Sequence, residues 1–121
     1  MRPFGELEAV IMDRVWSRTQ TVSVREVLED LLRERRLAYT TVMSVMDNLH
    51  RKGALARERD GRAYRYWAVR TREEHGAQLM REALDASGDR AGALVRFFEQ
   101  MNPKEVTQLR AALDAARRKG R

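Results

Sequence analysis

The side chains best suited to chemistry in this 121-residue chain are basic, and they gather in its middle third. Residues 33–65 hold nine basic and four acidic side chains, a net charge of +5, whereas residues 1–32 carry −2 and residues 66–121 carry +3. The plainer interpretation of a charge run is a solvated basic face. Because this run coincides with a helix and a hairpin pattern, a polyanionic partner is favoured instead.

Residue types that support catalysis or metal binding are sparse. The chain has no cysteine, which excludes disulfides, thiolate metal sites and cysteine nucleophiles. Of the two histidines, His50 is expected to face phosphate or solvent, and His75 to lie exposed on a helix. No hydroxyl group has a histidine and a carboxylate at a recognisable spacing, and there is no glycine-rich phosphate loop. We therefore expect no enzymatic activity, no cofactor and no metal.

The stretch from about Tyr39 to Lys52 predicts a helix with two unlike faces. Val42, Val45, Met46 and Leu49 form an apolar stripe, and Gly53 follows where a left-handed cap residue is expected. The opposite face carries hydroxyls and methionine, which suit base edges and thymine methyl groups in the major groove of DNA. The residues expected to face the major groove are Thr40, Thr41, Met43, Ser44 and Asp47, with Arg51 and Lys52 at phosphates. Tyr39 is also expected to contact DNA.

Asp47 is an awkward residue to place beside phosphates. Its spacing predicts an ion pair with Arg51, four residues later on the same helix face. The alternative is that its carboxylate accepts a hydrogen bond from a cytosine amino group.

An alternating pattern follows over residues 54–59 and 63–69, and Asp60-Gly61 between them is a strong hairpin signal. Arg59, Arg62 and Arg65 are placed to contact the DNA backbone or the minor groove. The aromatic residues Tyr64, Tyr66 and Trp67 resemble a stacking platform for single strands, but in a short hairpin packing onto helices is favoured.

Two further helices precede this pair of elements. Residues 6–16 show helical spacing, residues 17–22 read as a loop with a short strand, and Ser23 with Glu26 forms a capping box before another apolar stripe. Three helices followed by a basic hairpin predict a winged helix-turn-helix over residues 1–70, with residues 57–65 as the wing. The fold class is therefore mainly α with a small β-hairpin.

Residues 71–121 predict a separate helical region. A helix begins at Arg72, residues 87–89 break the pattern, and Asn102-Pro103 starts the last helix. This short segment cannot easily hide its apolar side chains alone, so a homodimer interface is favoured over a subdomain packed on the winged helix. The expected dimerisation residues are Leu79, Leu84, Leu94, Val95, Phe98, Met101, Leu109 and Leu113.

Nothing in the sequence indicates membrane insertion. No apolar run approaches the roughly 20 residues that a membrane span needs, and the first ten residues lack a signal-peptide apolar stretch. A cytoplasmic protein is expected.

The strings GELEAVIMDRVW, VSVREVLEDL, YTTVMSVMDNLHRKGAL and DGRAYRYWAV, in this order and spacing, resemble the BlaI/MecI penicillinase repressor family. The resemblance runs through nearly the whole chain and is strongest over residues 5–70. It implies a dimeric winged-helix repressor that binds dyad operators before β-lactamase and related genes. It also implies a membrane sensor with a metalloprotease domain, whose activation leads to cleavage of the repressor.

The sequence departs from the family pattern at two places. Staphylococcal members are cut at an Asn-Phe bond in the C-terminal helices, and Phe97-Phe98 occupies that place here. The family's proline before the recognition helix is Tyr39 in this chain. The first departure makes Phe97-Phe98 a candidate cleavage site, and the second predicts a differently shaped helix start.

Two alternative functions remain open at this level. One is a regulator of the same architecture that responds to a metal or a small ligand. The other is a winged-helix protein-interaction module whose aromatic hairpin docks a partner protein. DNA binding would weaken steeply with salt, whereas a protein-interaction module would show little salt dependence.

Overall fold

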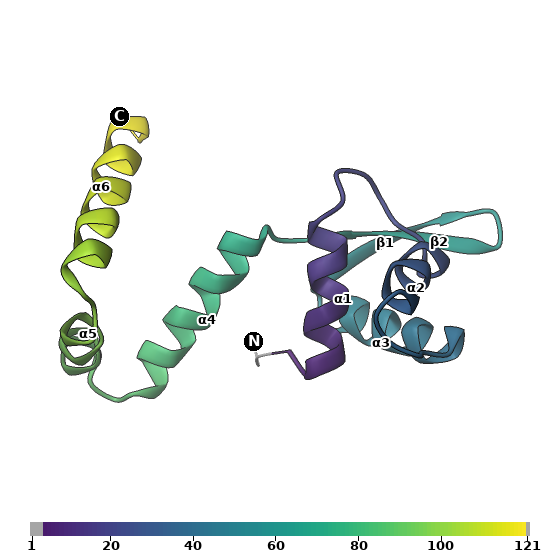
Figure 1. Cartoon of the computed structure of the whole chain (residues 1–121), viewed down its shortest axis with the longest axis horizontal. Coiled ribbons are helices and arrows are strands. Elements are labelled where there is room, and N and C mark those ends of the chain that lie inside the picture. The colour runs from purple at the N-terminus through teal and green to yellow at the C-terminus, as the bar shows by residue number, and fades with distance from the viewer. Residues whose placement is uncertain (1–3, 121) are drawn as a thin grey trace. The chain divides into compact units, whose positions relative to one another are not determined.

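The computed structural model describes residues 4–120. Along this part of the chain, helices α1 to α3 precede a hairpin, and α4 to α6 follow it (Figure 1). The elements are α1 Glu6–Trp16, α2 Val24–Leu32, α3 Tyr39–Arg51, β1 Leu55–Asp60, β2 Ala63–Ala68, α4 Arg72–Ala86, α5 Arg90–Glu99 and α6 Pro103–Lys119. The chain forms two compact units, one ending at Leu79 and the other beginning at Met80. This boundary lies inside α4, later than the expected division between residues 70 and 71.

The first unit is a winged helix built on one apolar core. The helices form where the sequence places apolar residues on one face, and α2 begins at the expected capping box of Ser23 and Glu26. Ile11 of α1, Val27 of α2 and Met46 of α3 are fully buried in the core, which the hairpin closes through Leu55 and Tyr66. The expected winged helix-turn-helix is confirmed.

The hairpin differs from the sequence expectation in the position of its turn. β1 and β2 pair antiparallel from Leu55 opposite Ala68 to Asp60 opposite Ala63, so the two-residue loop is Gly61-Arg62 and not Asp60-Gly61. Gly61 has a φ of 64° and no non-glycine residue among those described has a positive φ. A positive φ at the first loop position alone is the pattern of a type II′ turn, which needs glycine there. This register places Arg62 at the tip of the wing.

The aromatic side chains of the hairpin pack mainly inwards. Tyr66 is 2% exposed, and Val22 forms a bridge with it through backbone hydrogen bonds of 2.9 and 2.8 Å. The short strand expected in residues 17–22 is therefore this single bridge. Trp67, on the alternate side of β2, remains 38% exposed.

His75 is buried, and the expectation that it lies exposed on a helix was wrong. Its ring stacks on Phe4 at 4.4 Å between centroids and lies 5.6 Å from the ring of Trp16. The Trp16 indole donates a hydrogen bond of 2.9 Å to the Arg70 carbonyl, which fixes the chain just before α4. Burial, with the nearby positive charge of Arg70, lowers the pKa of His75. The first turns of α4 thus belong to the winged-helix core.

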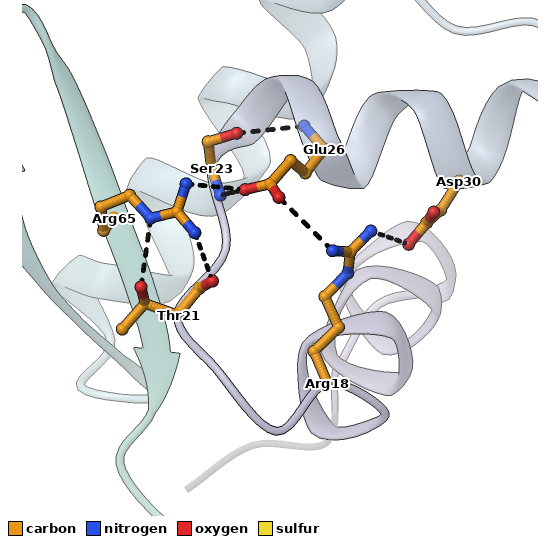
Figure 2. Close-up of polar contacts among 6 residues, drawn as sticks. All are labelled: Arg18, Thr21, Ser23, Glu26, Asp30 and Arg65. Carbon is orange, nitrogen blue, oxygen red and sulfur yellow. Dashed lines mark hydrogen bonds and ion pairs between the residues drawn. The ribbon is translucent and has the colours of Figure 1, made fainter.

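A polar network joins the wing to the start of α2 (Figure 2). From β2, Arg65 donates to the hydroxyl and the carbonyl oxygens of Thr21 at 3.1 and 2.6 Å, and it pairs with Glu26 at 2.8 Å. The Glu26 carboxylate also accepts from the Ser23 backbone N–H at 2.9 Å and lies 3.5 Å from Arg18. One carboxylate therefore caps α2 and anchors the wing.

Glu26→Gln is expected to lower the free energy of unfolding by about 1 kcal/mol at neutral pH, because the charged partner of Arg65 and Arg18 is lost. The hydrogen bonds from Ser23 and these cations lower the pKa of Glu26 in the folded state. Its stabilisation is therefore complete above the ordinary value of 4.5 and is lost as the pH falls through the folded pKa.

Urea unfolding measured from about pH 7 to pH 3 checks this expectation. The variant's stability should fall less steeply on acidification than that of the wild type, so the two curves converge at low pH. Glu29→Gln removes an exposed carboxylate from the same helix and serves as the control. Parallel curves for Glu26→Gln and the wild type would contradict a stabilising role for the Glu26 charge.

Candidate nucleic-acid interface

The helix α3 presents two chemically distinct faces. Val42, Met46 and Leu49 are fully buried against the rest of the first unit, because they share one face of the helix. The opposite face is open, and Met43 there is 42% exposed beside the hydroxyl of Ser44. The expected contact residues that lie exposed on or next to α3 are Tyr39, Thr40, Thr41, Met43, Ser44, Arg51 and Lys52.

The start of α3 is uncapped by any side chain. Ala38 is the N-cap residue in an extended conformation, and the helix begins at Tyr39 although no proline is present. Tyr39 is 41% exposed, and the Arg25 guanidinium of α2 lies 5.7 Å from the centre of its ring. Free backbone N–H groups at a helix start favour anions. Sequence reasoning missed Arg25, whose one signal was its place in the first turn after the Ser23 cap.

A shallow hollow of about 390 Å³ separates this helix start from the wing. Its lining includes Arg25 of α2, Tyr39 and Met43 of α3, and Arg62 and Tyr64 of the hairpin. The structure thus brings the exposed half of α3 and the wing tip to one surface.

Asp47 holds two arginines and lines a neighbouring hollow, which shares Met43 and Tyr64 with the first. Its Oδ2 lies 2.9 Å from Arg51 Nη2, which confirms the ion pair predicted from their spacing, and its Oδ1 lies 3.0 Å from Arg57 Nη1. The Arg57 guanidinium also stacks 4.1 Å from the centre of the Tyr64 ring and donates to the Tyr66 hydroxyl at 3.4 Å. Sequence reasoning missed Arg57, because no local spacing links β1 to α3.

Three other residues expected at DNA or solvent are bonded within the chain. Arg65 is half-buried in the network of Thr21 and Glu26, so its guanidinium does not face outwards. Lys52 pairs with Glu8 at 2.7 Å, and this contact is the main cause that lowers the pKa of Glu8. His50 donates from Nδ1 to the Leu55 carbonyl at 3.1 Å, so it joins α3 to β1. Arg59 and Arg62 of the wing remain exposed.

The second unit lacks a core of its own among its described residues. Neither α5 nor α6 contains a buried residue. Of the residues expected at a dimer interface, Leu94, Val95, Phe98 and Leu113 are exposed, whereas Leu84, Met101 and Leu109 are half-buried. Leu79 is half-buried at the end of the first unit. A groove of about 320 Å³ between α4 and α5 is lined by Met80, Ala83, Leu84, Ala93, Leu94 and Phe97.

The described residues 4–120 contain neither a metal-binding cluster nor a membrane-spanning helix. No cluster of three or more histidine, aspartate or glutamate side chains there has the arrangement to hold a metal ion. None of the helices described combines the length and the apolar character needed to cross a bilayer.

The comparisons with known proteins agree on a regulator. The penicillinase repressor family model matches residues 4–115. The transcriptional regulator BlaI of Mycobacterium tuberculosis is 46% identical over 112 residues, which cover 90% of this chain and 81% of that protein.

Solved structures share the fold at lower identity. The DNA-binding domain of the repressor BlaI superposes with a TM-score of 0.52 and 21% identity, over 60% of this chain and 90% of that domain. MepR, a transcription regulator of a Staphylococcus aureus multidrug efflux pump, gives a TM-score of 0.50 at 16% identity, over 98% of this chain and 81% of that chain. The chain therefore belongs to the penicillinase repressor family and is a winged-helix, DNA-binding transcriptional repressor, not an enzyme.

Proposed function

We propose that the chain represses β-lactamase-type genes by binding a dyad operator as a homodimer, with α3 of each protomer in the major groove. The observation that carries this proposal is the exposed face of α3, where Thr40, Met43 and Ser44 lie opposite a fully buried apolar stripe. Hydroxyls donate to and accept from base edges, and the Met43 side chain suits a thymine methyl group. Tyr39 and Thr41 lie in the first turn of α3, which no side chain caps, and a helix start of this kind favours backbone phosphates.

The basic side chains divide into two roles in this proposal. Arg59 and Arg62 are exposed and supply phosphate or minor-groove contacts on any duplex, whereas Arg51, which is paired with Asp47, contacts phosphate only at the operator. Lys52 and Arg65 act indirectly, because their bonds to Glu8 and the α2 network hold α3 and the wing in place.

Arg62→Ala is expected to weaken binding about threefold to tenfold on every duplex. The variant loses a phosphate contact at the wing tip, whereas the contacts between α3 and the bases are kept. The slope of log K against log salt should become shallower by about 0.9. Fluorescence anisotropy with operator and unrelated duplexes over a salt series measures both quantities. Arg110→Ala, an exposed arginine of α6, is the matched control. Salt-insensitive binding by the wild type would favour a protein-interaction module and contradict the proposal.

The homodimer is proposed from the second unit. Val95, Phe97, Phe98 and Leu113 are each between 46 and 55% exposed in the single chain. Large apolar patches of this kind mark interaction surfaces, and a two-fold axis through them is the commonest arrangement. Two α3 helices about one turn of DNA apart would then read the two halves of a dyad. The second half-site contact becomes intramolecular, so a weak monomer contact yields a strong dimer complex.

Relief of repression is proposed to follow from loss of this interface. In the proposed scheme a membrane sensor with a protease domain leads to cleavage of the cytoplasmic repressor at Phe97-Phe98. This bond lies near the end of α5, which runs to Glu99, and both rings are about half exposed. Cleavage there separates α6 from the rest of the chain, because α6 follows this bond. The helical backbone in the last turn of α5 must first unwind to enter a protease site.

Leu113→Glu is expected to convert the dimer to a monomer, because it adds a charge to the apolar face of α6. Sedimentation velocity at micromolar concentration measures the oligomeric state. Fluorescence anisotropy should show at least a tenfold loss of operator affinity. Gln108→Glu adds the same charge on the opposite side of α6 and should leave both unchanged. A chain ending at Phe97 should behave like Leu113→Glu. If that shortened chain held the operator as tightly as the full chain, the proposed mode of relief would be refuted.

A further inference from the structure

The carboxylate of Asp47 lies on the surface that the proposed function turns toward DNA. Its side chain is 32% exposed, and it lines a small hollow with Met43, Ser44 and Tyr64. A negative charge at this place repels the phosphates that the surrounding arginines attract.

The same carboxylate restrains the two arginines nearest to it. Arg51 is otherwise open to solvent, with 74% of its side chain exposed, yet its guanidinium is bonded to Asp47. Arg57 is held more firmly, because it also contacts the rings of Tyr64 and Tyr66. A phosphate that recruits either guanidinium must compete with Asp47. Non-specific binding, which depends on phosphate contacts, is therefore weakened by this arrangement.

A hydrogen bond from a base can offset the repulsion between the Asp47 carboxylate and the phosphates. Each carboxylate oxygen has two acceptor positions, and each Asp47 oxygen has one arginine partner among the described contacts. A free acceptor position beside Ser44 suits the amino group that cytosine presents in the major groove. Phosphates and thymine offer acceptors there, so they leave the charge unpaired.

We propose that Asp47 is a specificity-determining residue, which holds Arg51 and Arg57 away from non-cognate backbone and accepts a hydrogen bond from a cytosine amino group at the operator. This inference rests on the proposed DNA-binding function. It makes the ratio of operator to non-specific affinity, more than the operator affinity itself, the property that Asp47 controls.

The test uses the full-length protein and two duplexes. One is selected by the wild type from a random pool of duplexes, and the other has the same base composition in shuffled order. Asp47→Asn keeps the shape of the side chain and removes its charge. Its binding to the shuffled duplex is expected to tighten at least about threefold, and its salt slope to steepen by about 0.9 for each arginine that gains a phosphate contact. Glu73→Gln, which removes an exposed carboxylate from α4, is the control for net charge.

The base contact is tested by changing each C·G pair of the selected half-site to T·A. The wild type is expected to lose about tenfold in affinity at one of these pairs, and Asp47→Ala, which has no acceptor oxygen, to lose its discrimination at that same pair. Arg51→Ala is a further variant that leaves Asp47 intact. It should keep the cytosine discrimination and weaken binding to the selected duplex. On the shuffled duplex it should lose less than about twofold, because Asp47 holds Arg51 away from a non-cognate backbone.

Each outcome has a distinct meaning. A wild type without preference for any selected duplex would refute the proposed function itself. If the wild type has such a preference, two results together would overturn the role of Asp47 alone: an unchanged ratio of selected to shuffled affinity in Asp47→Asn, and cytosine discrimination that persists in Asp47→Ala. A loss of cytosine discrimination in Arg51→Ala would also overturn it, because the arginine would then be the reader. Thermal unfolding of each variant verifies that the fold is retained.

Discussion

The burial of one face of α3 is the constraint on which the rest of the winged helix depends. Val42, Met46 and Leu49 are fully excluded from solvent, and the helix contacts α1, α2 and β1 around them. Each such side chain contributes about 1.5 to 3 kcal/mol, whereas an exposed ion pair contributes at most about 1 kcal/mol. The apolar stripe therefore sets the rotation of α3 about its own axis. Which hydroxyls and which methionine face outwards is a consequence of that rotation.

Charge has a different part in the same unit, because several basic side chains of α3 and the hairpin are paired with carboxylates of the same chain. Arg65 and Lys52 are bonded to carboxylates from α2 and α1, so part of the net positive charge of residues 33–65 maintains geometry. Exposed basic side chains of this stretch also lie after α2, at Arg33, Arg35 and Arg36, and on the wing, at Arg59 and Arg62. A count of basic residues overestimates the electrostatic footprint, since the count does not distinguish paired from open cations.

The two units differ in what stabilises them: the first has a buried core, and the helices α5 and α6 of the second have end caps but no buried residue. The first closes a core around Tyr66 and the α3 stripe, and it even buries an ionisable ring, His75, between aromatic neighbours. The second has helices with good caps, including the box of Asn102 and Glu105, yet α5 and α6 bury nothing fully. Capping gives a helix its ends but supplies little of the free energy that holds it in a protein. The exposed apolar side chains of the second unit would be buried only if a partner surface covered them.

Local patterns in the amino-acid sequence were sufficient for the helices, their caps, the hairpin and the two faces of α3. Such features depend on residues within one or two turns of each other, as with Ser23 and Glu26, or on a glycine such as Gly53, whose φ is 83°. The family resemblance and the Asp47–Arg51 pair also followed from short strings and a four-residue spacing.

Contacts between distant segments were decided by the folded chain. The Asp47–Arg57 pair, the inward turn of Arg65 and the burial of His75 each join residues from different elements. The turn register was likewise missed, because strand pairing moved the loop to Gly61 and Arg62 although Asp60-Gly61 was the stronger local signal. Periodicity states which face a residue occupies but not what lies opposite it. That neighbour is set by how helices and strands pack, which depends on the free energy of the whole core.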